Sequence, residues 1–113
     1  MTKDFVVNLN PEQTACIIIK AMAQSQEPSG VLLDDHRVTC ASGMFINLIF
    51  TRFFFRIGSF TTLVVTVSDV TGATVVRAAM GGHRGWFGRK WDLGAASTLI
   101  GEVERALADY VCS

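Results

Sequence analysis

The sequence has little proline and cysteine, and neither charge sign is in excess. Of its 113 residues, 2 are proline and 3 are cysteine, while 10 acidic side chains balance 10 basic ones. Scarce proline and an apolar content of 50% exclude a disordered or collagen-like chain. So few cysteines exclude a miniprotein built on disulfides. These absences predict a single folded domain over residues 1–113, and they exclude few functions.

Cysteine usage and the N-terminus predict a cytoplasmic location. Cys16, Cys40 and Cys112 are widely spaced and form no C-x-x-C pair, which is typical of a reducing compartment and of cysteines that serve as small buried hydrophobes. Asp4 stands where a signal peptide has its apolar core. The longest charge-free run, 38–51, has 14 residues, whereas a membrane-spanning helix needs about 20. We therefore expect no membrane span.

Capping residues and apolar spacing predict a helix that follows a short strand over residues 5–9. Asn10 can serve as its N-cap, Pro11 suits the first helical position, and Gln13 completes a capping box. The helix is expected to end near Gln26. Its apolar face consists of Ala15, Ile18, Ile19 and Met22.

Residues 31–80 are rich in Val, Ile, Phe and Thr and are interrupted by turn residues, a pattern that predicts an antiparallel meander. We expect Asp34 and Asp35 to form the turn before the meander, and residues 69–72 to form its last hairpin turn. The predicted strands are 36–42, 44–56, 60–69 and 73–80.

A second helix is predicted from Asp92 to about Val111. Its apolar stripe consists of Leu93, Ala96, Ile100, Val103, Leu107 and Tyr110, and its opposite face carries Glu102, Arg105 and Asp109. The element order is then β-α-β-β-β-β-α, which predicts a two-layer α+β fold with both helices on one face of the sheet. This order resembles the TATA-binding-protein-like topology and is also similar to small helix-grip folds. Topology alone assigns no function.

The longest predicted strand has apolar residues on both of its faces. Arg52 interrupts one of these faces, and a bulge near Thr51 would turn Arg52, Phe54 and Arg56 away from the helices. An apolar row then remains on the uncovered face: Phe45, Ile49, Phe54, Phe60 and Val64. Because large exposed apolar patches mark interfaces or ligand grooves, something is expected to cover it. The alternatives are a second copy of the chain, the protein's own loop 81–91, and an apolar small molecule.

Charge is distributed unevenly along the chain. Residues 36–91 carry seven permanent cations and one acid, a net of +6, and the remaining segments carry three cations and nine acids, a net of −6. Such a basic sheet and loop can attract an anion, unless acids of the helices neutralise it by packing over the ends of the sheet.

The loop 81–91 reads Gly-Gly-His-Arg-Gly-Trp-Phe-Gly-Arg-Lys-Trp. Its cations could hold an anion and its aromatic rings could stack on a flat group, although its spacing matches neither a Walker loop nor G-x-G-x-x-G. The alternative is a long connection whose glycines make turns and whose tryptophans plug the end of the sheet. The candidate binding residues in sheet and loop are Arg52, Phe54, Arg56, Arg77, His83, Arg84, Trp86, Arg89 and Trp91.

The glycine run and the start of the second helix also form a recognisable pattern. The residues that carry it are Gly81, Gly82, Gly85, Phe87, Asp92, Gly94 and Ala95. With these residues the chain from about Arg52 to Tyr110 resembles a family of small uncharacterised bacterial proteins, classed as a domain of unknown function. His83 replaces a third consecutive glycine of that motif, and Leu93 replaces a tryptophan. The resemblance implies a shared fold and no established activity.

No spacing predicts catalysis, a metal site or a cofactor. His36 and Cys40 lie on one side of a strand, but four residues of strand separate them by roughly 13 Å. An enzyme would have to centre on His83 and Arg84, for which only the loop argues. A nucleic-acid binder would use the basic sheet and the loop, with Arg52, Arg56, Arg77, Arg84 and Trp86, yet the balanced total charge argues against it. We therefore expect an interaction or ligand-binding module that acts as a homodimer through its sheet face, and whose ligand could be an apolar or anionic small molecule.

Overall fold

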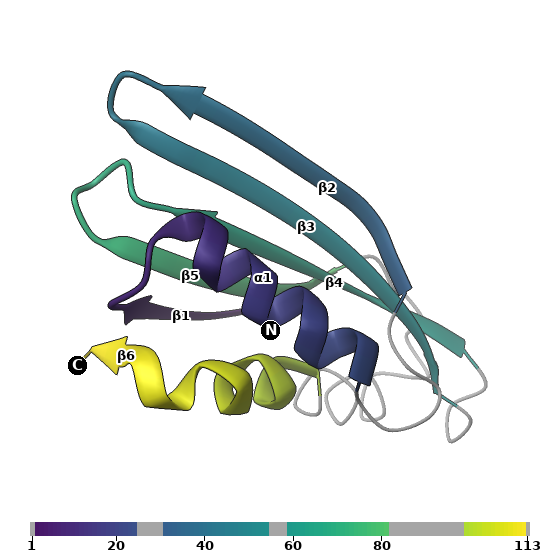
Figure 1. Ribbon diagram of the computed structural model, residues 1–113. Coiled ribbons are helices and arrows are strands. Elements are labelled where there is room, and N and C mark those ends of the chain that lie inside the picture. Colours follow the sequence, from purple (N-terminus) through teal and green to yellow (C-terminus); the bar gives the residue numbers. More distant parts are fainter. Residues whose placement is uncertain (1, 25–30, 55–58, 82–98, 113) are drawn as a thin grey trace.

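The computed structural model describes residues 2–24, 31–54, 59–81 and 99–112 (Figure 1). Its elements in chain order are β1 (Thr2–Val7), α1 (Pro11–Gln24), β2 (Val31–Cys40), β3 (Gly43–Phe54), β4 (Ser59–Ser68), β5 (Thr74–Gly81), a helix that includes residues 99–107 and is called the C-terminal helix, the 3-10 turn η2 (Ala108–Tyr110), and β6 (Val111–Cys112).

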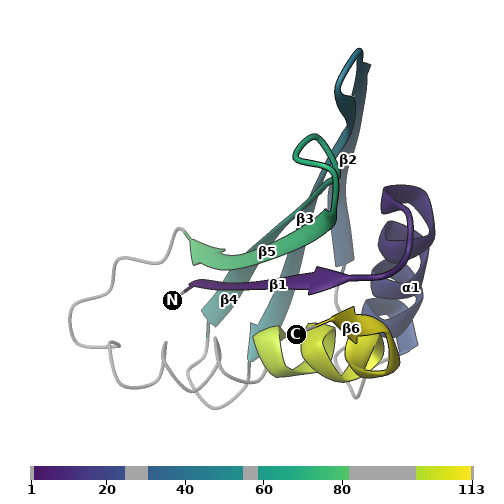
Figure 2. The same ribbon diagram turned by 90° about the vertical axis from the view of Figure 1, so that its left-hand side faces the viewer.

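The described strands form one six-stranded antiparallel sheet in the order β2-β3-β4-β5-β1-β6. The strands β2 to β5 form a meander, and the N-terminal strand β1 pairs with the last strand of that meander. Both helices lie on the same side of the sheet (Figure 2). The predicted α+β class, the element order and the placement of the helices are therefore confirmed.

The capping box at the start of α1 forms as predicted. The amide of Gln13 donates to Oδ1 of Asn10 at 2.7 Å, and the amide of Asn10 donates to Oε1 of Gln13 at 3.2 Å. These bonds satisfy two amides that a helix start would otherwise leave unpaired. The helix buries Ala15, Ile18 and Met22 against the sheet. The helix is described as far as Gln24, and its predicted end near Gln26 lies outside the described residues.

Asp69 joins the two tight turns of the meander. It begins the predicted turn 69–72, which is confirmed because the amide of Gly72 donates to the Asp69 carbonyl at 2.9 Å. Its carboxylate accepts the amide of Met44 at 2.8 Å. Gly43 approaches so closely, with a φ of +149°, that a Cβ there would lie 2.2 Å from Oδ1 of Asp69. A glycine at this position is therefore required by both conformation and space.

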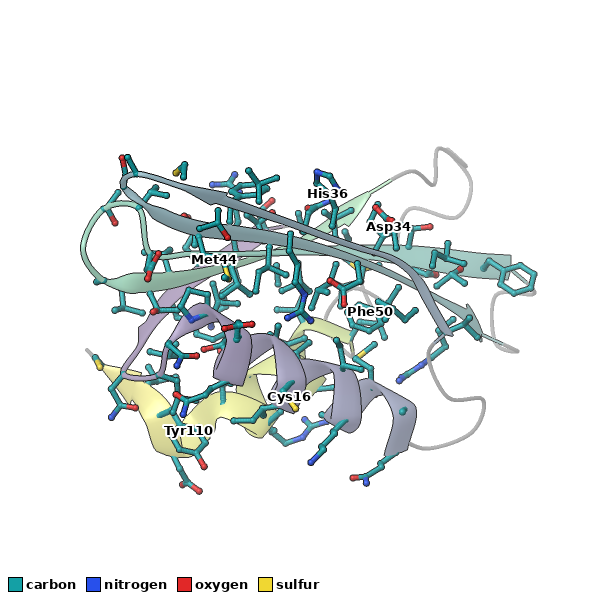
Figure 3. The ribbon with its side chains drawn as sticks, turned by 45° about the horizontal axis from the view of Figure 1, so that its top comes forward. Cys16, Asp34, His36, Met44, Phe50 and Tyr110 are labelled. Atoms are coloured by element: carbon teal, nitrogen blue, oxygen red, sulfur yellow. The ribbon has the colours of Figure 1, made fainter. Side chains whose placement is uncertain are left out.

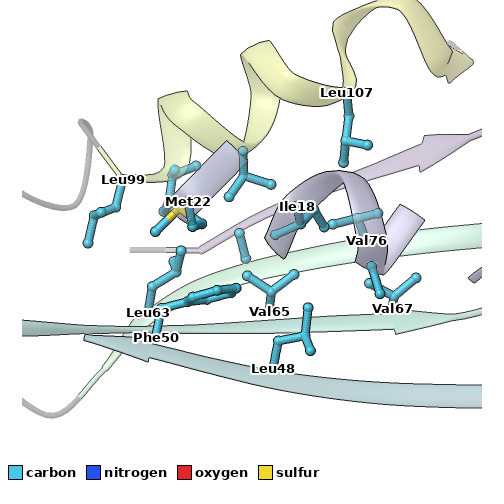
Figure 4. Close-up of a cluster of buried hydrophobic side chains, with 14 of the residues drawn as sticks. Ile18, Met22, Leu48, Phe50, Leu63, Val65, Val67, Val76, Leu99 and Leu107 are labelled. Carbon is cyan, nitrogen blue, oxygen red and sulfur yellow. The ribbon is translucent and has the colours of Figure 1, made fainter. Parts of the chain in front are cut away.

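The hydrophobic core fills the layer between the sheet and the two helices (Figure 4). The helices contribute Ile18, Met22, Leu99, Ile100, Val103 and Leu107, and the strands contribute Val7, Ile46, Leu48, Phe50, Leu63, Val65, Val67, Val76 and Ala78. Every second residue is buried over 46–52 of β3, 61–67 of β4 and 74–78 of β5, as the alternation of a half-covered strand requires.

The first strand of the meander begins earlier than predicted. β2 starts at Val31, so Asp34 and Asp35 lie inside the strand, and the prediction that they form a turn is wrong. The register against β3 shifts between Leu32 and Asp34. All ten residues of β2 are exposed. Charged residues fit this strand because it lies at the edge of the sheet, where neither face is fully covered.

The C-terminal segment also differs from the prediction of a helix up to about Val111. The helix gives way to η2 at Ala108, and Val111 and Cys112 then pair with Val7 and Val6 of β1. The amide of Asn8 donates to the carbonyl of Tyr110 at 2.9 Å. The edge of β1 thus offers backbone hydrogen bonds that end the helix early. The predicted helix start at Asp92 lies outside the described residues.

The three cysteines were predicted to be buried, and this is wrong. Cys16, Cys40 and Cys112 are all exposed and free. Cys16 lies on the polar side of α1, Cys40 closes the edge strand β2, and Cys112 lies in β6 at the other edge. Each position lies outside the layer that the helices cover.

Candidate functional site

The face of the sheet toward the helices contains an arginine that was predicted to point away from them. β3 pairs with β4 without interruption from Phe45 opposite Ser68 to Phe54 opposite Ser59, so the predicted bulge near Thr51 does not form. Arg52 therefore stays in phase with Phe50 and points toward the helices, with 5% of its side chain exposed. The predicted outward orientation of Arg52 is wrong because the ladder continues through Thr51.

Glu102 of the C-terminal helix neutralises Arg52. Its two carboxylate oxygens accept hydrogen bonds from the two terminal guanidinium nitrogens, at 2.5 and 2.7 Å. Only 12% of the Glu102 side chain is exposed, so its predicted place on the solvent side of the helix is also wrong. This bidentate pair fixes the helix against β3. It also makes Arg52 unavailable to an external anion.

The opposite face of the sheet, called the outer face below, carries the predicted apolar row. Figure 3 shows Asp34 and His36 on this side, and Phe50 on the side toward α1. Phe45 is 39% exposed and Phe60 is 63% exposed. Half-buried Ile49 and Val64 lie directly opposite each other in β3 and β4. The predicted positions of Phe45, Ile49, Phe60 and Val64 are confirmed; the side chain of Phe54 lies outside the described residues.

The register arranges the outer face into alternating rows that cross the strands. One mainly apolar row consists of Val38, Phe45, Ser68, Val75 and Val6, and a second consists of Ile49, Val64 and Ala79 with Asp34 and Thr2 at its ends. Between them runs a polar row of His36, Asn47, Thr66, Arg77 and Asp4. In this row the hydroxyl of Thr66 lies 3.3 Å from Oδ1 of Asn47, and Arg77 lies 3.4 Å from Asp4. The outer face therefore offers apolar contact area and hydrogen-bonding groups side by side.

The remaining candidate residues do not form a described basic site. Arg77 lies on the outer face, where its side chain is 59% exposed and paired with Asp4. The other candidates lie outside the residues whose side chains are described: Phe54, Arg56, His83, Arg84, Trp86, Arg89 and Trp91. The anion-binding and stacking roles predicted for loop 81–91 therefore stay predictions.

The described residues contain no group of three or more His, Cys, Asp or Glu side chains that could hold a metal ion. His36 and Cys40 face the same side of β2, opposite Asn47 and Gly43 respectively. Within the described ranges, no helix is long and apolar enough to cross a membrane.

A second feature is an open groove of about 570 Å³ beside β1, which sequence reasoning missed. It is lined by Lys3, Phe5, Gly101, Glu104, Arg105, Ala108 and Val111. Lys3 and Glu104 form a 2.8 Å ion pair there, with half-exposed side chains. No local signal could have found this groove, because its walls come from opposite ends of the sequence.

No family model matches the sequence, and no curated protein matches it. The resemblance to a family of bacterial proteins therefore stays a prediction.

Proposed function

We propose that this protein is a small interaction module that self-associates through the outer face of its sheet. The observation that carries the proposal is the exposure of Phe45 and Phe60 on a face that neither described helix covers. Exposed aromatic side chains are enriched at protein interfaces. The outer face is therefore the surface on which we expect a partner.

A second copy of the chain is the partner that the outer face fits best. A two-fold axis brings the same patch of both copies together, so apolar row can meet apolar row and the polar row can supply hydrogen bonds. The charged residues on this face are of both signs, with Asp4 beside Arg77 and Asp34 on the edge strand β2. A face of mixed charge favours contact with itself over contact with a polyanion.

The alternatives receive less support from the described residues. A small molecule is normally held in a concave pocket, whereas Phe45 and Phe60 stand on an open sheet surface. A nucleic acid would need free cations, but Arg52 is committed to Glu102 and Arg77 pairs with Asp4. An enzyme centred on His83 and Arg84 stays a prediction, because both residues lie outside the described ranges.

The test is the mass of the protein in solution, measured by sedimentation equilibrium over a range of concentrations. Phe45→Glu places a charge in the middle of an apolar row and is expected to halve the mass of the assembly. Val70→Glu is the matched control, because Val70 is 41% exposed but lies in the turn between β4 and β5. A monomeric wild type, or a Phe45→Glu variant that is folded by circular dichroism and keeps the wild-type mass, would contradict the proposal.

A further inference from the structure

The strand β2 forms one edge of the sheet and is exposed along its whole length. It is first in the strand order, and one of its sides pairs with β3 from Val31 to Cys40. Along its other side no strand of the described residues pairs with it, and all ten of its residues are exposed. An exposed edge strand presents backbone amides and carbonyls to any further strand that arrives.

The charges in the middle of β2 are arranged symmetrically about His36. Asp35 and Arg37 flank His36 and point to the side of the helices, since they lie opposite Leu48 and Ile46. They form an ion pair within the chain, with Arg37 donating to the two Asp35 oxygens at 2.8 and 3.0 Å. Glu12 of α1 lies 4.0 Å from Arg37. This arrangement makes the strand complementary to an antiparallel copy of itself.

We propose that β2 pairs with β2 of a second copy, antiparallel, about a two-fold axis at His36. In this register Asp35 of each copy lies opposite Arg37 of the other, so two further ion pairs form and the four charges alternate. Cross-strand pairs of opposite charge are favourable, and like charges directly opposite each other are unfavourable. This edge contact is separate from the outer-face contact, and it would extend the sheet from one copy into the next.

The neighbouring registers are disfavoured by the same side chains. A shift that centres the axis on Asp35 places the two Asp35 carboxylates opposite each other, and a shift to Arg37 places the two guanidinium groups opposite each other. A shift of the register by one residue would place side chains that face opposite sides of the sheet across from each other. The register irregularity between Leu32 and Asp34 bounds the regular part of the strand. The charges therefore select one register within a short ladder from Asp34 to Val38.

Charge reversal tests the pairing. Asp35→Arg alone and Arg37→Asp alone each place like charges opposite each other, so each variant is expected to lose at least 10-fold in the association constant of the edge contact, measured by sedimentation. An equimolar mixture of the two single variants is expected to form mixed pairs, and the double variant Asp35→Arg/Arg37→Asp is expected to regain wild-type association. Asp109→Arg is the control, since Asp109 is exposed in η2, away from β2.

The mixture distinguishes loss of the contact between copies from loss of the ion pair within a chain. Both variants still lack the internal ion pair in the mixture, so association that returns there must come from ion pairs between copies. Singles that associate like the wild type would overturn the proposal. So would a mixture that forms no mixed pairs.

Cross-linking tests the register. In a chain whose Cys16, Cys40 and Cys112 are replaced by serine, His36→Cys is expected to form a disulfide between copies under mild oxidation, because directly opposite Cβ atoms lie about 4.5–5.5 Å apart. Val38→Cys is the control, since its partner in this register is Asp34. Cross-linking of Val38→Cys as fast as that of His36→Cys would overturn the register.

Adding Phe45→Glu to the His36→Cys chain distinguishes the edge contact from the outer-face contact. If the edge contact exists, the disulfide at position 36 still forms when the outer-face contact is broken. If Phe45→Glu halves the mass but no cross-link forms at position 36 in either background, the edge contact is refuted and the outer-face contact stands. If the cross-link forms but Phe45→Glu leaves the mass unchanged, the outer-face contact is refuted instead.

Discussion

The two faces of β3 differ in what covers them. On one face Ile46 and Leu48 are fully buried beneath the helices, while on the other Phe45 is 39% exposed and Ile49 is half-buried. The outer face carries Phe45 and Ile49 beside polar Asn47, although the solvated face of a sheet normally carries polar residues. The helices therefore account for only part of the apolar pattern in this strand. The exposed apolar residues Phe45 and Ile49 are explained if a partner covers the outer face.

The largest effect is expected where a charge lies on the covered face. Arg52→Ala leaves Glu102 buried without its partner and is expected to lower the free energy of unfolding by about 3–5 kcal/mol, measured by urea denaturation. Arg77→Ala on the outer face is expected to change it by less than about 1 kcal/mol, because that pair is exposed. Equal losses for the two variants would mean that the two faces do not differ as described.

The double variant Arg52→Met/Glu102→Leu sharpens this result. Replacing a buried ion pair by apolar residues of similar volume is often neutral or stabilising. We expect the double variant to recover most of the stability that Arg52→Ala loses. A double variant as unstable as Arg52→Ala would show that the pair itself, and not the avoidance of an unpaired charge, stabilises the contact between β3 and the C-terminal helix.

Neighbouring residues of β3 compare the two faces directly. Leu48→Ala is expected to lower the free energy of unfolding by about 2–5 kcal/mol at any protein concentration, because Leu48 is fully buried within the chain. Ile49→Ala is expected to lose less at low concentration and more at high concentration, where a second copy covers the outer face. A loss for Ile49→Ala that is independent of concentration would be evidence against self-association through this face.

The smallest effect is expected at the edge strand. The hydrogen bonds from Arg37 hold the pKa of Asp35 below its usual range, against a smaller opposing effect of desolvation. Because the pKa is lower in the folded state, the stabilisation is complete above the unfolded pKa and is lost as the pH falls through the folded pKa. The stability advantage of wild type over Asp35→Asn should therefore shrink in acid. An advantage that stays constant into strong acid would show that this ion pair does not stabilise the fold.

Elements whose residues interact within a few positions of one another could be predicted from the sequence. Asn10 and Gln13 predict the start of α1, because a capping box is formed by residues three apart. Alternation in β4 predicts that Leu63 and Val65 are buried and Val64 is not. The apolar row of the outer face follows from the same alternation in β3.

Partners distant in sequence could not be predicted in this way. Arg52 was expected to avoid the core because its partner Glu102 is 50 residues away. The strand β6 was missed because its pairing depends on the edge of β1 at the other end of the chain. The long edge strand β2 was shortened in the prediction because Asp34 and Asp35 disfavour strands in general, and exposure at the sheet edge removes that penalty.

The most direct test of the outer-face contact is an isotope-filtered nuclear Overhauser experiment on a mixture of labelled and unlabelled chains. The outer-face contact predicts intermolecular signals that involve Phe45, Ile49 and Val64. No intermolecular signals at these residues at a concentration where the protein sediments as an assembly, or intermolecular signals from Ile46 and Leu48 instead, would contradict it.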